Sequence, residues 1–284
     1  MRKLPKVSVI LPAYNAENFL RRAVESLFRQ SYGNMEILLV DDASTDATWA
    51  IIEQLRRESP VPLIAVRLET NQGPMQARNT ALAKATGELI AYQDADDESE
   101  YRRFENQVDF LRKNPWAAMV YTDYREVADT RMRIQRAGAF SYKRLLLRNY
   151  IACGSVMHHY EVYAKTGPWD RNDDWGYWLR VADNFKIGYL DRPLYRYHLD
   201  MDGFSAQCGV VRNLRMDART FKETYQRTKA FMPLFKWFYL SLLLFPMVRL
   251  ENHPQAVIFI NRTRRLFEAI VYRVLFKNDS QKWR

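Results

Sequence analysis

Short apolar runs alternate with longer amphipathic stretches along the first hundred residues of the chain. The runs are rich in β-branched and aliphatic side chains, which is typical of buried strands, and they predict strands at residues 7–11, 35–40, 63–68 and 88–93. Between them, apolar residues recur at helical spacing, as from Phe19 to Phe28. This alternation predicts βαβ units and a parallel sheet with helices on both of its faces.

Polar residues between the runs predict where helices begin and end. Ser44, Thr45 and Asp46 are good N-caps for a helix that reaches residue 57. Pro74 favours the first turn of the next helix, and Gly87 is expected to stop it.

The second half of the chain has mixed signals, with helices and strands less regularly spaced. A polar stretch that ends at Gly138 favours a hairpin or a mobile loop. The expected helices lie at residues 100–114, 142–148, 160–166 and 173–185, and the expected strands at 117–121, 187–191 and 194–198.

Acidic clusters follow two of the expected strands. Asp41 and Asp42 come after the second strand, and Asp94, Asp96 and Asp97 come after the fourth. The carboxyl ends of parallel strands share one edge of a sheet, where ligands bind in such folds. Carboxylates this close repel one another unless water, a basic group or a cation compensates, and Mg2+ or Mn2+ takes oxygen ligands together with substrate phosphates. The clusters predict a nucleotide and metal site, whereas each cluster by itself equally fits a solvated turn.

The formal net charge of +10 is concentrated in the C-terminal part of the chain. Residues 1–211 carry 28 basic and 28 acidic side chains, whereas residues 212–284 carry 15 basic and 5 acidic ones. A basic tail on a neutral body predicts contact with an anionic surface, either a membrane or a nucleic acid. Nucleic acid is disfavoured, because no nucleic-acid module accompanies the charge.

Within the tail, the near-apolar residues 237–248 are too few for the roughly 20 residues that cross a bilayer. Residues 256–276 combine apolar side chains at helical spacing with arginines, which is typical of a helix at a membrane surface. A helical lid packed on the body is the other interpretation, and both stay open. Two cysteines and a short N-terminal apolar run favour a cytoplasmic protein, peripheral at the inner membrane face if the tail binds lipid.

Four motifs in order resemble the family 2 glycosyltransferases of GT-A fold: VSVILPAYNAENFLRRAVESLFRQSY, EILLVDDASTDATWAII, NQGPMQARNTALAKATGELIAYQDADD and DDWGYWLRVA. They cover roughly residues 5–200 at compatible spacing. The resemblance implies an α/β fold of GT-A type, a Rossmann-like mixed sheet flanked by helices, with the helical tail added here. It also implies transfer of a sugar from a nucleotide diphosphate donor to an acceptor hydroxyl, with inversion at the anomeric carbon.

The resemblance assigns the nucleotide-sugar side to five residues. Asp42 would recognise the base, Tyr14 would stack on it, and Pro12 lies in the same motif. Arg78 would lie near the donor phosphates and Asp94 near the ribose. A carboxylate that accepts from an imide N–H favours a UDP-type donor.

The metal, Mn2+ or Mg2+, is assigned by the same resemblance to Asp96, with His198 as a second contact. It would act as a Lewis acid on the departing diphosphate, whose charge grows as the glycosidic bond breaks. For Asp97 two roles stay open, a water-mediated metal contact and a cap on the next helix, and the cap is preferred.

Asp174 matches the general base of the family, and Asp173 and Trp175 would lie on the acceptor side. An inverting displacement needs one carboxylate to take the acceptor proton, unlike a retaining glycosidase, which uses a second one as nucleophile. The alternative is that Asp173 and Asp174 only cap a helix. Many relatives have Glu in the first position and a further Asp where this chain has Gly176.

The expected organisation is a catalytic domain at residues 1–211, with a nucleotide-sugar half at 1–98 and an acceptor half at 99–211, and a basic tail at 212–284. The expected partners are a nucleotide diphosphate sugar, a glycan or lipid-linked acceptor and an anionic membrane surface. A catalytically silent sugar-nucleotide-binding or scaffold protein is the alternative, supported by Gly176. A nucleotidyltransferase is disfavoured, because no Gly-rich basic loop follows the first strand.

Overall fold

The computed structural model describes residues 4–128, 131–170, 174–199 and 222. The chain divides into two units, residues 1–203 and residues 204–284, and the elements named below all belong to the first. Asp173 and the predicted tail therefore lie outside the described residues, apart from Lys222. None of the helices in the described part is long and apolar enough to span a bilayer.

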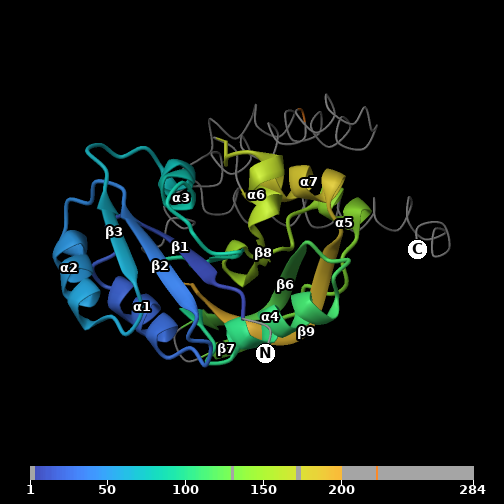
Figure 1. The fold of residues 1–284 in the computed structure, drawn as a ribbon, viewed down its shortest axis with the longest axis horizontal. Coiled ribbons are helices and arrows are strands. Elements are labelled where there is room, and N and C mark those ends of the chain that lie inside the picture. The colour runs from blue at the N-terminus through green and yellow to red at the C-terminus, as the bar shows by residue number, and fades with distance from the viewer. Residues whose placement is uncertain (1–3, 129–130, 171–173, 200–221, 223–284) are drawn as a thin grey trace, which may run out of the picture. The chain divides into compact units, whose positions relative to one another are not determined.

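Strands and helices alternate regularly in the first half of this unit and less regularly in the second (Figure 1). In chain order they are β1 (Val7–Ala13), α1 (Leu20–Phe28), β2 (Met35–Asp41), α2 (Thr48–Glu58), β3 (Leu63–Arg67), α3 (Pro74–Leu82), β4 (Leu89–Tyr92), β5 (Glu98–Ser99), α4 (Arg103–Lys113), β6 (Met119–Ala128), β7 (Arg131–Gln135), α5 (Tyr142–Leu147), the 3-10 turn η1 (Cys153–Ser155), β8 (Met157–His159), α6 (Tyr160–Thr166), α7 (Asp174–Asn184) and β9 (Ile187–His198).

The described strands form one mixed sheet in the order β3-β2-β1-β4-β8-β6-β9-β5, with β7 paired to β6 at the side. The four strands predicted from the first hundred residues pair in parallel, as expected. β8 then runs antiparallel to both β4 and β6, and β9 runs parallel to β6. The parallel sheet of the first half is thereby continued by a mixed second half.

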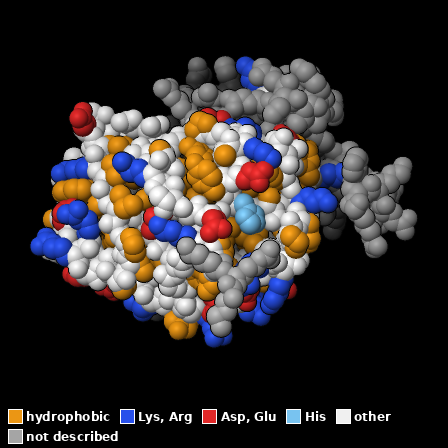
Figure 2. Space-filling view, viewed as in Figure 1, with side chains coloured by type: hydrophobic (Ala, Val, Ile, Leu, Met, Phe, Trp, Pro, Cys, Tyr) orange, Lys and Arg blue, Asp and Glu red, His pale blue; other side chains and the backbone are white. Residues whose placement is uncertain are grey.

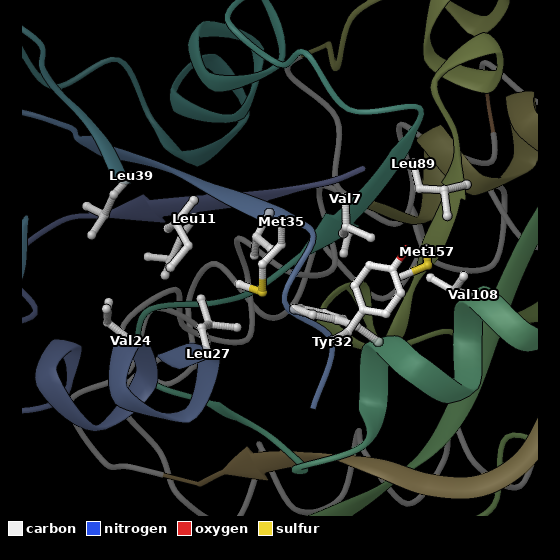
Figure 3. Packing of buried hydrophobic residues seen from close by; sticks show 14 of the residues in the cluster. Val7, Leu11, Val24, Leu27, Tyr32, Met35, Leu39, Leu89, Val108 and Met157 are labelled. Carbon is white, nitrogen blue, oxygen red and sulfur yellow. The ribbon is translucent and has the colours of Figure 1, made fainter. Parts of the chain in front are cut away.

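The hydrophobic core follows the two-residue period of the strands. Odd-numbered residues of β1, β2 and β4 form one apolar layer with α1, α2 and α4, and Figure 3 shows Leu11 and Leu39 of the sheet opposite Val24 and Leu27 of α1. On the other face, α3 packs over β1 and β2. Helices cover both faces of the parallel strands, as predicted, because both faces are apolar.

The polar stretch before Gly138 is a hairpin of β6 and β7, which confirms the hairpin interpretation. The two segments predicted as strands near the end of the unit, residues 187–191 and 194–198, are both strand, and they are joined in one continuous strand, β9. Pro193 lies within β9, and the register with β6 shifts on both sides of Asp123, which pairs with Pro193. The irregular register lets a strand pass through a proline that would otherwise interrupt the ladder.

Some residues predicted to begin or end a helix have other roles in the structure. α2 begins at Thr48, and its N-cap residue is Ala47 rather than one of the three predicted residues. Asp46, one residue earlier, accepts from the Thr48 amide at 3.0 Å. Ser44 and Thr45 instead bond Asn15 in the loop after β1, and for them the capping prediction is wrong.

Gly87 does not stop α3, because that helix ends at Leu82. A Cβ at Gly87 would lie 2.7 Å from the carbonyl oxygen of Lys6 and from the amide nitrogen of Ser8. Glycine is needed here because the chain entering β4 passes directly against the backbone at the start of β1.

Basic and acidic side chains are intermixed over the described part of the face in Figure 2, with apolar side chains scattered between them. This matches the equal numbers of 28 basic and 28 acidic residues in residues 1–211. No single sign of charge covers the described part of this face.

Candidate active site

The residues predicted to bind the nucleotide sugar lie at the ends of three parallel strands, along one edge of the sheet. Pro12 lies near the end of β1 and Tyr14 just beyond it, while Asp42 follows β2 and Asp94 follows β4. Tyr14 is 46% exposed, so its ring is available at this edge. The prediction that these residues share an edge is confirmed by the strand register; their roles toward a nucleotide stay predictions.

Pro12 lies inside the sheet without losing a ladder hydrogen bond. The amide of Gln93 donates to the Ile10 carbonyl at 3.0 Å, which shows that even-numbered residues of β1 direct their polar backbone groups toward β4. β4 ends at Tyr92, opposite Ile10, so the missing N–H of Pro12 falls beyond the last paired residue.

The loops after β1 and β2 are tied to each other at this edge. The amide of Ala16 donates to the Thr48 hydroxyl at 2.7 Å, and the amide of Asn15 donates to the Ser44 hydroxyl at 2.9 Å. Asn15 and Ala43 have left-handed backbones, with φ of 46° and 59°. Such strained residues persist only where the surroundings hold them, and they concentrate at functional sites.

Asp42 is only 2% exposed and holds the loop that precedes α3. Its two carboxylate oxygens accept from the backbone amides of Gln72 and Gly73, each at 2.8 Å. Each oxygen keeps a second acceptor position, so the base-recognition role stays a prediction. The observed role is to fix the start of α3 against the end of β2.

Arg78 lies one turn into α3 and reaches the residues that follow β4. We call residues 94–97, which include three aspartates, the acidic segment. The Nη2 atom of Arg78 donates to Asp94 Oδ1 at 2.7 Å, and its guanidinium lies 5.3 Å from the centre of the Trp169 ring. Arg78 is 7% exposed, so this is a nearly buried ion pair rather than a surface contact. The structure thus joins Arg78 and Asp94, two residues that the family resemblance assigns to the donor.

Asp97 does not cap a helix, and that prediction is wrong. It is followed by β5, and α4 begins only at Arg103. Its Oδ1 accepts from the backbone amide of His198 at 2.8 Å. Burial, with the nearby charges of Asp96 and Asp94, raises the pKa of Asp97 well above its usual range.

The predicted metal contacts lie around this segment. The His198 ring is close to it, but its Nε2 is paired with Glu98 Oε2 at 2.8 Å. The described residues contain no group of three or more His, Cys, Asp or Glu side chains arranged to hold a metal ion. The roles of Asp96 and His198 toward a metal stay predictions.

Asp174 opens α7 and faces the same cluster from the second half of the unit. Its Oδ1 accepts from Asn149 Nδ2 at 3.1 Å. Burial raises the pKa of Asp174 to about 6; the Arg78 charge opposes this rise and the Asp94 charge adds to it. The fold therefore brings together the predicted base, Arg78 and Asp94.

Trp175, predicted on the acceptor side, is 2% exposed, and its indole N–H donates to the Leu145 carbonyl at 2.6 Å. A side chain this buried presents almost no surface to an acceptor, so its position adds no support to that assignment.

Two residues that support the acidic segment were missed by sequence reasoning. Arg103 is fully buried and donates to the Tyr92 carbonyl at 2.9 Å and to the Ser99 hydroxyl at 2.8 Å, and burial lowers its pKa to about 10. The Tyr195 hydroxyl accepts from the Asp94 amide at 3.2 Å. Nothing in a helical arginine or a strand tyrosine marks such roles in sequence.

Comparison with known proteins places this chain in a family. Residues 8–167 match the family model Glycosyl transferase family 2. A Bacillus subtilis (strain 168) protein named "Putative glycosyltransferase EpsE" is 32% identical over 218 residues, which cover 72% of this chain and 77% of that protein. An Escherichia coli protein named UDP-Glc:alpha-D-GlcNAc-diphosphoundecaprenol beta-1,3-glucosyltransferase WfaP is 31% identical over 187 residues, which cover 62% of this chain and 69% of WfaP.

Among solved structures, mannosyltransferase PcManGT from Pyrobaculum calidifontis, in complex with GDP-Man and Mn2+, is similar in fold. Its TM-score is 0.65 at 17% identity, and the match covers 98% of this chain and 89% of that one. The mixed sheet with flanking helices is the GT-A fold, as predicted. The chain belongs to glycosyl transferase family 2 and is a glycosyltransferase.

Proposed function

We propose that this glycosyltransferase moves a sugar from a UDP-type donor to an acceptor hydroxyl of a glycan or lipid-linked saccharide. It does so with inversion, with a divalent metal and with Asp174 as the general base. The observation that carries the proposal is the Asp174 carboxyl beside the Arg78–Asp94 pair, with its pKa raised to about 6. The name of the WfaP relative, with a UDP-Glc donor and a diphosphoundecaprenol-linked acceptor, supports this choice of donor and acceptor class.

The donor diphosphate would lie between the start of α3 and the acidic segment. Free amides at a helix N-terminus and the guanidinium of Arg78 both attract phosphate oxygens. Asp42 fixes the α3 end of this cradle through its two backbone contacts. Arg78 would have to share its charge between Asp94 and the phosphates.

Mn2+ or Mg2+ fits the acidic segment in one respect. The Asp97 carboxyl is buried next to the charges of Asp94 and Asp96, and a cation would offset the repulsion among these carboxylates. A hard cation needs only one or two carboxylates together with substrate phosphates, so Asp96 would hold it, with His198 as a second contact. When bound, it would stabilise the charge that develops on the departing diphosphate.

Asp174 would accept the proton of the acceptor hydroxyl as its oxygen attacks the anomeric carbon. A general base is most effective when its pKa lies near the working pH, and burial brings Asp174 toward that range. Asn149 holds one carboxylate oxygen, which orients the other for the proton.

Ligand stabilisation tests the donor and the metal together. UDP with Mn2+ should raise the thermal midpoint of the protein by several degrees, because a ligand at about 100 times its Kd adds about 2.7 kcal/mol to stability. A chelator should reverse most of this shift, and GDP should stabilise less than UDP. A shift that survives chelation contradicts the metal assignment, and one larger with GDP contradicts the UDP assignment. Hydrolysis of a UDP-sugar distinguishes the two candidate functions. An enzyme should hydrolyse it in a reaction that a chelator abolishes, whereas a catalytically silent binding protein should not hydrolyse it.

The pH dependence of transfer tests the base. Because burial raises the pKa of Asp174 to about 6, its carboxylate form is lost as the pH falls through 6. The rate at saturating donor should therefore rise about tenfold per pH unit below 6 and level off above 7. UDP binding measured at each pH controls for donor affinity. A rate that stays constant from pH 5 to 7 contradicts the assignment.

A further inference from the structure

Three neighbouring strands of the second half carry a continuous row of sugar-compatible side chains on one face. β6 lies between β7 and β9, and directly paired residues on neighbouring strands point to the same face. We call these residues the acceptor strip: an inner row of Gln135 and Tyr124, and an outer row of Arg133, Glu126 and Tyr197. Tyr195, which pairs with Tyr124, is fully buried and lies at the inner end of the strip.

The inner row begins at the acidic segment. The Tyr195 hydroxyl contacts the Asp94 amide at 3.2 Å. Burial first, and then the charge of Glu126, raise the pKa of Tyr124; the Arg148 charge opposes this rise and the Asp97 charge adds to it. From there the strip continues along the strands toward the β6–β7 turn.

The two faces of these strands differ in chemistry. On the opposite face, Arg125 pairs with Glu100 at 2.5 Å, and Arg196 pairs with the same carboxylate at 2.8 Å. There, Met132 and Ile134 are exposed apolar side chains. Tyrosine rings combined with hydrogen-bonding side chains lie on the strip face, whereas the paired residues of the opposite face from Arg125 to Val127 carry arginines, His198 and apolar side chains.

Within the strip, rings and hydrogen-bonding groups alternate. The rings of Tyr124 and Tyr197 lie edge to face with their centroids 6.0 Å apart. Gln135 Nε2 donates to Glu126 Oε2 at 2.6 Å, and the neighbouring Arg133 is exposed. A sugar offers apolar C–H faces that pack on aromatic rings and hydroxyls that need carboxylate, amide or guanidinium partners. The strip supplies both, next to the reaction centre.

We propose that the acceptor strip binds the saccharide of the acceptor, with Glu126 and Arg133 as its outer hydrogen-bonding contacts. This inference rests on the proposed function and names the residues that would select the acceptor. It locates acceptor binding on β6, β7 and β9 rather than at the buried Trp175. The strip could instead bind only the diphosphate of a lipid-linked acceptor, through Arg133. The experiment must distinguish this outcome from binding of the saccharide.

The test measures UDP release by the full chain at saturating UDP-glucose and Mn2+ with two acceptor probes. One probe is GlcNAc-diphospho-prenol, and the other is the prenyl diphosphate without sugar. Each rate is expressed relative to the acceptor-free hydrolysis of the same variant. The variants are Glu126→Gln and Arg133→Ala. Glu161→Gln is the matched control, because Glu161 is an exposed acid on α6, outside the strip, whose ion pair is with Lys165 one turn away.

In the wild-type protein, the sugar-bearing probe should stimulate UDP release. Glu126→Gln and Arg133→Ala should each raise its half-saturating concentration about tenfold, the usual effect of losing a hydrogen bond to a charged group. The Glu161→Gln variant should match the wild type. Arg133 is exposed, so its variant remains informative if Glu126→Gln fails to fold.

Unchanged half-saturating concentrations in both variants overturn the proposal, as does a wild-type protein that hydrolyses donor without responding to the sugar-bearing probe. If the variants weaken the response to both probes equally, the strip binds the diphosphate rather than the sugar, and the proposal is also overturned. If the proposed function itself fails, UDP-glucose is neither bound nor hydrolysed by the wild type, which is a different result.

Discussion

Asp174→Asn protein should transfer sugar between 10²- and 10⁴-fold more slowly than the wild type, because a positioned general base contributes about that much to a rate. The amide cannot take the acceptor proton. Its oxygen can still accept from Asn149, so the start of α7 should be preserved. The measurement is the initial rate of transfer at saturating donor and acceptor, with UDP binding followed by thermal shift.

Stability provides a second readout on the same variant. The folded-state pKa of Asp174 is raised to about 6, so the folded protein is penalised where this group is ionised, above that pH. Asp174→Asn should therefore be at least as stable as the wild type at pH 7.5. Any gain should shrink as the pH falls below 6 and disappear below 3.8, the ordinary pKa of the group, where the Asp174 carboxyl is protonated in both the folded and the unfolded wild-type chain. A folded, UDP-binding variant with a normal transfer rate would show that the base is another group.

Arg78→Ala should destabilise the protein by about 3 kcal/mol, because removing one partner of a buried ion pair leaves the other charge uncompensated. Arg78 is 7% exposed and contacts both Asp94 and the Trp169 ring. If it also serves the donor phosphates, UDP affinity should fall about tenfold or more. Urea unfolding and UDP titration measure the two effects.

The matched control is Arg56→Ala, which removes an exposed arginine paired with Glu53 three residues away. Surface pairs of this kind contribute less than about 1 kcal/mol. Adding Asp94→Asn to Arg78→Ala should recover part of the lost stability, since the uncompensated charge is then gone. Equal stability of the two single arginine variants would contradict the buried-pair interpretation.

The first four strands were predictable because short apolar runs rich in β-branched and aliphatic residues favour a strand locally, and each strand was found within two residues of its predicted bounds. Their shared edge followed from parallel pairing, which placed Tyr14, Asp42 and Asp94 together. The start of α3 at Pro74 and the end of α6 before Gly167 also follow from backbone rules.

The failed predictions involve polar residues whose partners lie far along the chain. Ser44 and Thr45 bond the loop after β1, 29 and 30 residues away, instead of capping α2. Asp97 accepts from His198, 101 residues later, instead of capping α4. Local sequence rules consider only hydrogen-bond partners that are near in sequence. In the folded protein, a partner that is distant in sequence but suitably placed can form the hydrogen bond instead.

The sequence by itself determined the α/β class of the first half and the strand-end positions of its acidic clusters, because periodicity and spacing are local. The candidate base, Asp174, came from the family resemblance and stays a prediction. Only the tertiary structure decided that Arg78 pairs with Asp94, that Asp174 faces this pair with a raised pKa, and that the acidic segment meets β9. Burial and charge at these residues come from elements joined by the mixed sheet, and no short stretch of sequence contains that information.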